Sequence, residues 1–332
     1  MNMVSRKEVA ERAGVSVATV SYVLNGKPGV SEQTRRKVHA VMSELGYKPS
    51  YAARALKIKK TNHLAVLVHY LGDPFEAGIL SHIEHQARSH GYFVSFQTYH
   101  REDEERFLQD VSGRIDGVLL LGQSLMEENL SGLLASGIPV VSILEPMRRT
   151  GGDAFVDMDW EEGMRQLIRH FAEQGHRRIG FMATGISDHP HERRREAFRI
   201  AMAAEGLHYT EEDVLIGGGR LEGAKSAMKQ HLTGGTDLVP AAWIAANDLM
   251  AVGMLSACRE AGVRVPEDMG IAGCENILMT EQTEPRMTVL DYPRRHIAHM
   301  AVDMLVECIA NKQPRSCKIE SRLIIRGSSA RE

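Results

Sequence analysis

The chain has 332 residues, a length that predicts more than one domain, and its formal net charge of −3 points to no partner class by itself. It holds no run of about 18 apolar residues, and its charged amino terminus lacks the apolar core of a signal peptide, so we expect neither a membrane protein nor a secreted one. The four cysteines show no metal-type spacing and are expected to stay reduced. These features favour a cytoplasmic protein.

The near-neutral total hides an uneven charge distribution. Residues 1–60 hold 12 of the 40 Lys and Arg residues but only 4 of the 43 acidic residues, a formal charge of +8 that leaves −11 on residues 61–332. A basic head on an acidic body is the electrostatic pattern expected of a tethered DNA-binding domain.

The first pattern along the chain predicts a helix, a tight turn and a second helix over residues 4–25. Ser5 and Glu8 have the spacing of a capping box at the start of the first helix, and Gly14 suits the position that ends it. Ser16 is placed to cap the second helix. Such a helix-turn-helix inserts its second helix into the DNA major groove. The residues expected to face outward from that helix are Val17, Ala18, Ser21 and Tyr22.

A third helix is expected to begin after Ser31 and to end at Gly46, which completes a small three-helix domain. A domain of this kind without any role on DNA is the alternative. The positive charge of residues 1–60 counts against that alternative, because a basic surface seldom coincides with this motif by chance.

From Thr61 onward, short apolar runs alternate with amphipathic helical stretches, which indicates parallel sheets joined by crossover helices. The length suggests two such sheet units, with ligands at the carboxyl ends of the strands. The expected strands cover residues 63–69, 92–98, 115–121, 139–143, 178–183, 241–246, 269–274 and 319–326. The expected helices include residues 74–89, 160–174, 191–205 and 249–261.

Several motifs occur in the order found in one family of regulators. They include Ala13-Gly14-Val15-Ser16, Thr19-Val20-Ser21, Val23-Leu24-Asn25, Leu45-Gly46-Tyr47, Gly175-His176-Arg177-Arg178-Ile179 and Ala246-Asn247-Asp248. Because they span almost the whole chain, the sequence is identified as a member of the lactose/galactose repressor (LacI/GalR) family.

The resemblance implies an α/β fold class: an N-terminal helix-turn-helix domain followed by a two-lobed body with parallel sheets, similar to periplasmic binding proteins. The implied domains are a DNA-binding domain at 1–48, a hinge helix and linker at 49–60, and an effector-binding and dimerisation domain at 61–332. Within the last domain, the expected lobes are 61–158 with 291–312, and 159–290 with 313–332.

The resemblance also places Val17, Ala18 and Tyr22 at the three main base-reading positions. Tyr22 stands where the family often has Arg, so a bidentate contact to guanine is lost and the operator sequence stays open. In the hinge, it implies that Ala53 lies at the contact of the paired helices and that Leu56 wedges between base pairs. An ordinary linker leucine is the alternative for Leu56. The full expected DNA-contacting set is Ser5, Ser16, Val17, Ala18, Thr19, Ser21, Tyr22, Asn25, Ala53, Leu56 and Lys57.

The family likeness further implies a small-molecule effector, with a sugar or sugar derivative as the leading class, in the cleft between the lobes. Departures from the family pattern leave room for an unusual ligand or none: Gly217-Gly218-Gly219 replaces a stretch that commonly brings an acid and an aromatic, and Cys274-Glu275-Asn276 replaces an aromatic-Asp-Asp. For Asp159, a purely structural role is the alternative to effector binding. The expected effector-binding set is Asp73, Phe75, Asp159, Arg194, Asn247, Asp248 and Glu275.

Enzyme-like signals in the sequence are weak. Residues 218–226 imitate a phosphate-binding loop, but Ala224 separates the glycine from Lys225, and residues 189–192 are more typical of a polar loop than of a metal site. No nucleophile-elbow pattern occurs. We therefore expect no enzyme, cofactor or metal, but a transcriptional regulator, a repressor by the family default, that binds a palindromic operator as a homodimer under effector control. The alternative is a two-lobed solute-binding protein, which would need a secretory signal and no basic head.

Overall fold

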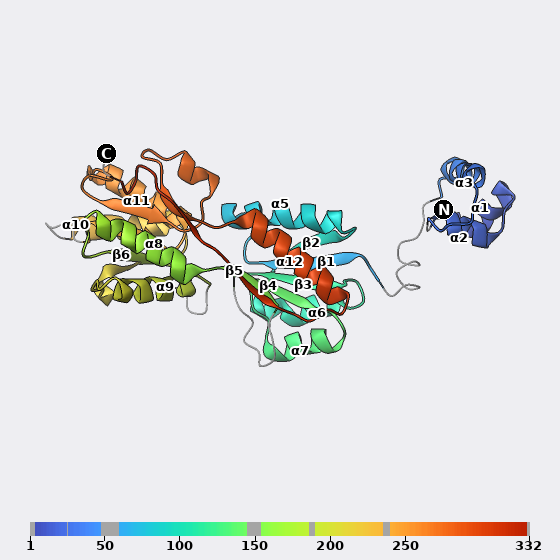
Figure 1. Cartoon of the computed structure of the whole chain (residues 1–332), viewed down its shortest axis with the longest axis horizontal. Coiled ribbons are helices and arrows are strands. Elements are labelled where there is room, and N and C mark those ends of the chain that lie inside the picture. Colours follow the sequence, from blue (N-terminus) through green and yellow to red (C-terminus); the bar gives the residue numbers. More distant parts are fainter. Residues whose placement is uncertain are drawn as a thin grey trace. The chain divides into compact units, whose positions relative to one another are not determined.

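The computed structural model describes residues 4–24, 26–47, 60–144, 154–185, 190–234 and 240–330. The chain divides into two compact units, Met1–Thr61 and Asn62–Glu332, and each is considered by itself (Figure 1). The predicted α/β fold class is confirmed. No helix in the described ranges is long and apolar enough to cross a membrane.

The first unit contains α1 (Arg6–Ala13), α2 (Val17–Leu24) and α3 (Glu32–Glu44). The predicted capping box is present, since the backbone N–H of Ser5 donates to Glu8 Oε2 (2.6 Å) and the N–H of Glu8 donates to Ser5 Oγ (3.3 Å). Gly14 ends α1 in the left-handed region, with φ of +61°. The three helices enclose a small core, formed by the buried residues Val9, Ala10, Ala13, Val20, Val23, Val38 and Val41.

The second unit is built on two six-stranded sheets. The first sheet contains, in spatial order, β11 (Ser316–Ile319), β5 (Phe155–Met158), β4 (Val140–Ile143), β3 (Gly117–Leu121), β1 (His63–Val68) and β2 (Phe93–Thr98). The second contains β12 (Arg322–Ile324), β10 (Thr288–Asp291), β9 (Gly270–Gly273), β8 (Ala242–Ala245), β6 (Gly180–Ala183) and β7 (Val214–Ile216). The pairs are parallel except β10 with β12.

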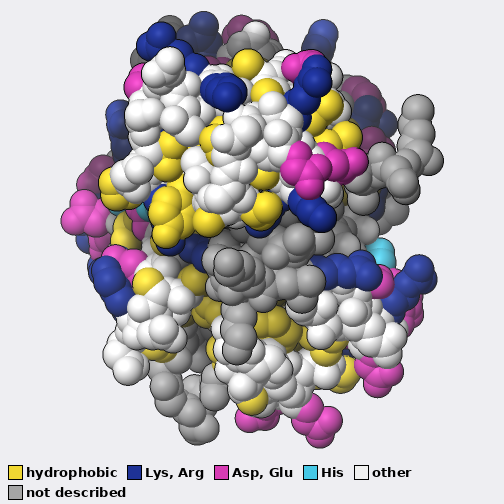
Figure 2. All heavy atoms as spheres, turned by 90° about the vertical axis from the view of Figure 1, so that its right-hand side faces the viewer, with side chains coloured by type: hydrophobic (Ala, Val, Ile, Leu, Met, Phe, Trp, Pro, Cys, Tyr) yellow, Lys and Arg dark blue, Asp and Glu magenta, His cyan; other side chains and the backbone are white. Residues whose placement is uncertain are grey.

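Helices cover the faces of both sheets. Around the first sheet lie α5 (Pro74–Ser89), α12 (Arg294–Ile309), α6 (Glu104–Val111) and α7 (Glu127–Ala135), and Figure 1 shows the first two on one face and the last two on the other. Around the second lie α8 (Trp160–Glu173), α9 (Pro190–Ala204), α10 (Leu221–Thr233) and α11 (Asp248–Ala261). Because both faces are covered, strands such as β1 and β3 are almost wholly buried and carry continuous apolar runs. At the surface, Figure 2 shows charged side chains of both signs with hydrophobic side chains between them.

Most of the expected strands are present, one or two residues shorter than predicted. The sequence did not predict β5, β7 and β10. One expectation was wrong. The single strand expected at 319–326 is two short strands in different sheets, because β11 pairs with β5 in the first sheet and β12 pairs with β10 in the second. Residues 316–319 therefore belong to the first lobe, whereas the sequence assigned 313–332 to the second.

The chain crosses between the lobes after β5, after β10 and between β11 and β12. A buried carboxylate lies where the first two of these crossings meet. Asp157 of β5 is 0% exposed and accepts hydrogen bonds from Arg193 Nη1 (2.9 Å) and Trp160 Nε1 (3.0 Å), and the hydroxyl of Tyr292 lies 3.4 Å away. Arg193 also donates to the carbonyl of Leu144. Burial raises the pKa of Asp157 to about 6, even though the Arg193 guanidinium favours the charged form.

Candidate functional site

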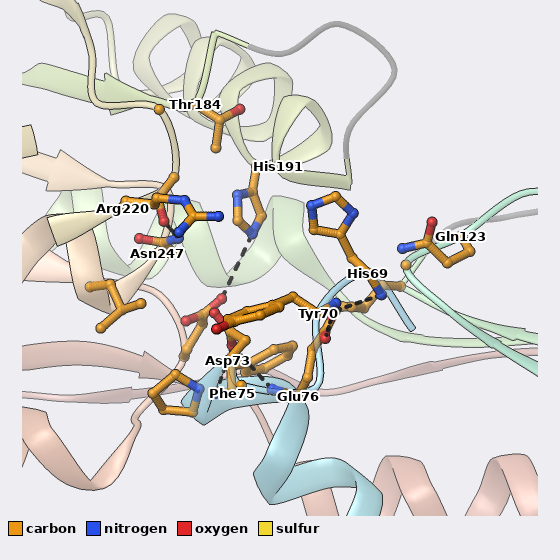
Figure 3. A pocket seen from close by; sticks show the side chains of 18 residues that line it. His69, Tyr70, Asp73, Phe75, Glu76, Gln123, Thr184, His191, Arg220 and Asn247 are labelled. Carbon is orange, nitrogen blue, oxygen red and sulfur yellow. Dashed lines mark hydrogen bonds and ion pairs between the residues drawn. The ribbon is translucent and has the colours of Figure 1, made fainter. Parts of the chain in front are cut away.

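A cavity of about 240 Å³ lies between the two lobes, at the carboxyl ends of the parallel strands (Figure 3). Loops that follow strands of both sheets supply its walls, as expected for ligand sites in open parallel sheets. The first lobe contributes His69, Tyr70, Asp73, Phe75, Glu76 and Gln123, and the second contributes Thr184, His191, Gly218, Gly219, Arg220, Asn247 and Glu275.

Four of the predicted effector residues line this cavity: Asp73, Phe75, Asn247 and Glu275. Asp73 caps α5, because its Oδ1 accepts the backbone N–H groups of Phe75 (2.8 Å) and Glu76 (3.2 Å). Asn247 caps α11 through its Oδ1 and donates its Nδ2–H to the carbonyl of Gly219 (2.9 Å). Two polar side chains that line the cavity, Asp73 and Asn247, thus fix the helix starts that shape it.

Arg194 lies behind the cavity wall rather than on it. It is 1% exposed, its guanidinium carbon lies 4.2 Å from the centre of the Trp160 ring, and its Nη1 pairs with Glu275 Oε1 at 2.9 Å. Its Nη2 is buried and makes no hydrogen bond to any described residue. Burial raises the pKa of Glu275, and the neighbouring Arg194 opposes that shift.

The two remaining predicted residues, Asp159 and Asp248, do not line the cavity. Asp159 caps α8 by accepting the N–H of Glu162 (3.2 Å). This is the structural role that the sequence offered as the alternative to effector binding. Asp248 is 0% exposed and accepts the N–H groups of Glu275 (3.1 Å) and Ile277 (2.8 Å). Asp248 therefore positions the loop that carries Glu275.

Sequence reasoning missed several lining residues, including Tyr70, Gln123, Thr184 and Arg220. All of them follow a strand or a glycine loop within a few residues, and that position was the available signal. His191 was considered as a possible metal ligand, and a polar loop was favoured at its position. Within the described part of the chain, no cluster of three or more His, Cys, Asp and Glu side chains is placed to hold a metal ion.

Glu76 is the lining carboxyl with the clearest expected dependence on pH. Burial raises its pKa to about 7, although the backbone N–H groups of Tyr70 (2.9 Å) and His69 (3.3 Å) donate to its oxygens. A carboxyl with a raised pKa in the folded state binds its proton more tightly there than in the unfolded chain. Its contribution to the free energy of unfolding is therefore fully present below pH 4.5 and is lost as the pH rises to about 7.

We expect Glu76→Gln to remove this pH dependence. The free energy of unfolding of the variant, relative to the native protein, should rise between pH 5 and pH 8 by up to about 3 kcal/mol, because glutamine cannot ionise. Urea unfolding at both pH values measures the difference, with Glu105→Gln on the surface of α6 as the matched control. An equal difference at both pH values would contradict the raised pKa.

The first unit presents a second candidate surface on α2. Val17 and Tyr22 are 45% and 46% exposed, and Ala18 is exposed as well, whereas Val20 and Val23 of the same helix are buried. Val17, Ala18 and Tyr22 are thus exposed as the sequence predicted, and Ser21 is half-buried. The predicted cap of α2 is also present, because Ser16 Oγ accepts the N–H of Thr19 at 3.0 Å. The predicted contacts Asn25, Ala53, Leu56 and Lys57 lie outside the described residues.

Comparison with known proteins is consistent with both surfaces. Residues 6–50 match the model of the bacterial regulatory proteins of the lacI family, and residues 168–329 match a periplasmic binding protein-like domain. The transcriptional repressor PurR of Photobacterium profundum is 30% identical over 98% of this chain and 98% of its own length. The solved structure of the transcriptional regulator CelR with cellobiose is 30% identical, with a TM-score of 0.74 over 98% of this chain and all of that one.

The Lac repressor dimer bound to operator and the anti-inducer ONPF is 24% identical, covers 99% of both chains and has a TM-score of 0.87, which shows a shared fold. The PurR relative matches along nearly the full length of both proteins. The chain therefore belongs to the LacI family of bacterial regulatory proteins, as a DNA-binding transcriptional regulator and not an enzyme.

Proposed function

We propose that this regulator binds a roughly palindromic operator as a homodimer and that a small molecule in the interlobe cavity changes its affinity for that operator. The observation that carries the proposal is the cavity itself, whose walls come from both lobes in nearly equal share. A ligand that contacts both lobes binds some lobe arrangements more tightly than others, and only such a difference can shift an equilibrium. A sugar or sugar derivative is the leading class, since the similar regulator CelR was solved with cellobiose.

The exposed face of α2 is the proposed reading surface. Small apolar side chains at Val17 and Ala18 suit contacts to thymine methyl groups, and Tyr22 can donate one hydrogen bond or stack on sugar and phosphate. Lys27 lies close to this face, with its Nζ 5.5 Å from the centre of the Tyr22 ring. We also propose the domain limits 1–48, 49–60 and 61–332, and a cytoplasmic location that follows from the DNA partner.

Selection of operators from random DNA, repeated with a panel of monosaccharides and disaccharides, tests the proposal. We expect an enriched palindrome and a change of affinity for it with at least one ligand. Enrichment of a single half-site by a monomeric protein would contradict the dimer, and affinity that no panel ligand changes would contradict sugar control.

We expect Tyr22→Arg to change the base preference within each half-site. Arginine offers a bidentate contact to guanine that tyrosine lacks, and such a pair contributes roughly 1–3 kcal/mol of discrimination. Sequencing of the selected sites should show guanine enriched at one position of each half-site. Lys7→Arg on the exposed face of α1 is the control, because it adds an arginine outside the reading surface. An unchanged site profile for the Tyr22 variant would exclude this role.

A further inference from the structure

We propose that the effector carries a negatively charged group, a carboxylate or a phosphate on a molecule of sugar size, and that Arg220 and the glycine loop before it bind that group. The inference rests on the proposed function, because it names the ligand class of the same cavity. The volume of about 240 Å³ lies below the roughly 300–1,000 Å³ of sites for drug-sized ligands, which favours a compact ligand.

Arg220 is an exposed arginine that lines the cavity and pairs with no acidic residue in the described ranges. Its side chain extends into the cavity from the start of α10 (Figure 3). Its guanidinium lies 5.9 Å from the centre of the Tyr70 ring, and it forms no hydrogen bond or ion pair with any residue in the described ranges. Lys225, one turn further along α10, is instead paired with Glu260. An arginine in a cleft without an acidic partner is suited to bind a carboxylate or phosphate with two parallel hydrogen bonds.

None of the acidic residues that line the cavity pairs with Arg220 in the described structure, because protein groups hold each of them in place. Asp73 accepts two backbone N–H groups at the start of α5. Glu76 accepts two more, and its raised pKa of about 7 leaves it partly protonated near neutral pH. Glu275 is paired with Arg194. Arg220 is therefore the arginine, among the described residues that line the cavity, that remains free to pair with a ligand.

The backbone next to Arg220 has a conformation that lets a ligand approach it closely. Gly218 and Gly219 line the cavity and have φ of +66° and +75°, a conformation that other residues rarely adopt. The 13-residue helix α10 follows at once, and no side chain caps its first turn. Unpaired N–H groups at a helix start attract anions. Guanidinium, glycine loop and uncapped helix start thus meet at one edge of the cavity.

The test is isothermal titration calorimetry of the full-length protein with glucose, galactose, their sugar acids, their 6-phosphates and inorganic phosphate. We expect at least one acid or phosphate to bind roughly tenfold or more tightly than its neutral parent, and Arg220→Gln to lose that advantage. A preference for the sugar acids identifies a carboxylate, and a preference for the 6-phosphates identifies a phosphate. Arg259→Gln, an exposed change on α11 outside the cavity, should bind like the native protein.

The inference is overturned if neutral sugars bind as tightly as their charged forms, if Arg220→Gln keeps the preference for the anion, or if none of these compounds binds. Measuring how both variants bind the selected operator without ligand distinguishes a failure of this inference from a failure of the proposed function. Operator binding without an anion preference rejects only the inference, whereas failure of the native protein to select an operator rejects the proposed function.

Discussion

Val20→Asp is expected to abolish operator binding while the larger unit stays folded. Val20 is 0% exposed and lies in the small core of the first unit, between the three helices. A carboxylate buried there without a partner lowers the free energy of unfolding of the first unit by on the order of 3 kcal/mol or more. This is a large part of the total stability of a domain of this size. Fluorescence anisotropy on the selected operator should show an affinity at least about 100-fold weaker, because the reading helix loses its support.

The matched control is Val17→Ala, on the same helix but on its exposed face. Because Val17 is outside the core, this variant should fold normally and lose no more than about tenfold in operator affinity, the loss expected from one apolar base contact. Calorimetry should show the unfolding transition of the second unit unchanged in both variants. Tight operator binding by Val20→Asp would mean that α2 is not held by this core.

Local features of the fold could be predicted from the sequence, because each depends on residues close together in the chain. The capping box of Ser5 and Glu8, the end of α1 at Gly14 and the two faces of α2 all follow from spacings of three or four residues. The division of residues 316–324 between two sheets could not be predicted. It depends on which distant strand each segment meets, β5 for one and β10 for the other, and no local pattern encodes that choice.

Which residues line the cavity could also be predicted only in part. The family resemblance placed Asp159 and Asp248 at the ligand. The Asp159 carboxylate instead accepts a backbone N–H of the first turn of α8, and that of Asp248 accepts N–H groups of the loop after β9. Arg220 has no family motif to mark it, and its place in the cavity results from the glycine loop and the start of α10. A polar residue after a strand could be predicted to lie near the cleft. Whether its side chain binds the ligand or the protein depends on tertiary neighbours.

Two glycines inside helices look alike in the sequence and differ in their surroundings. Gly253 lies in α11 where α10 packs most closely, so a Cβ there would overlap the carbonyl oxygen of Leu221 and come within 3.1 Å of its carbonyl carbon. Gly132 lies on the exposed face of α7, and a Cβ there would meet nothing within 4 Å. One glycine permits a close contact between helices, and the other only weakens its helix.

Opposite effects are therefore expected from the same substitution. Gly253→Ala should lower the free energy of unfolding of the second unit by about 1–3 kcal/mol, because backbone atoms must move apart, and it should displace the start of α10 that borders the cavity. Gly132→Ala should raise it by about 0.5–1 kcal/mol, through the greater helix propensity of alanine. Urea unfolding followed by circular dichroism measures both. If Gly253→Ala proved as stable as the native protein, the close packing of α10 on α11 would be wrong, and with it the position assigned to Arg220 at the cavity edge.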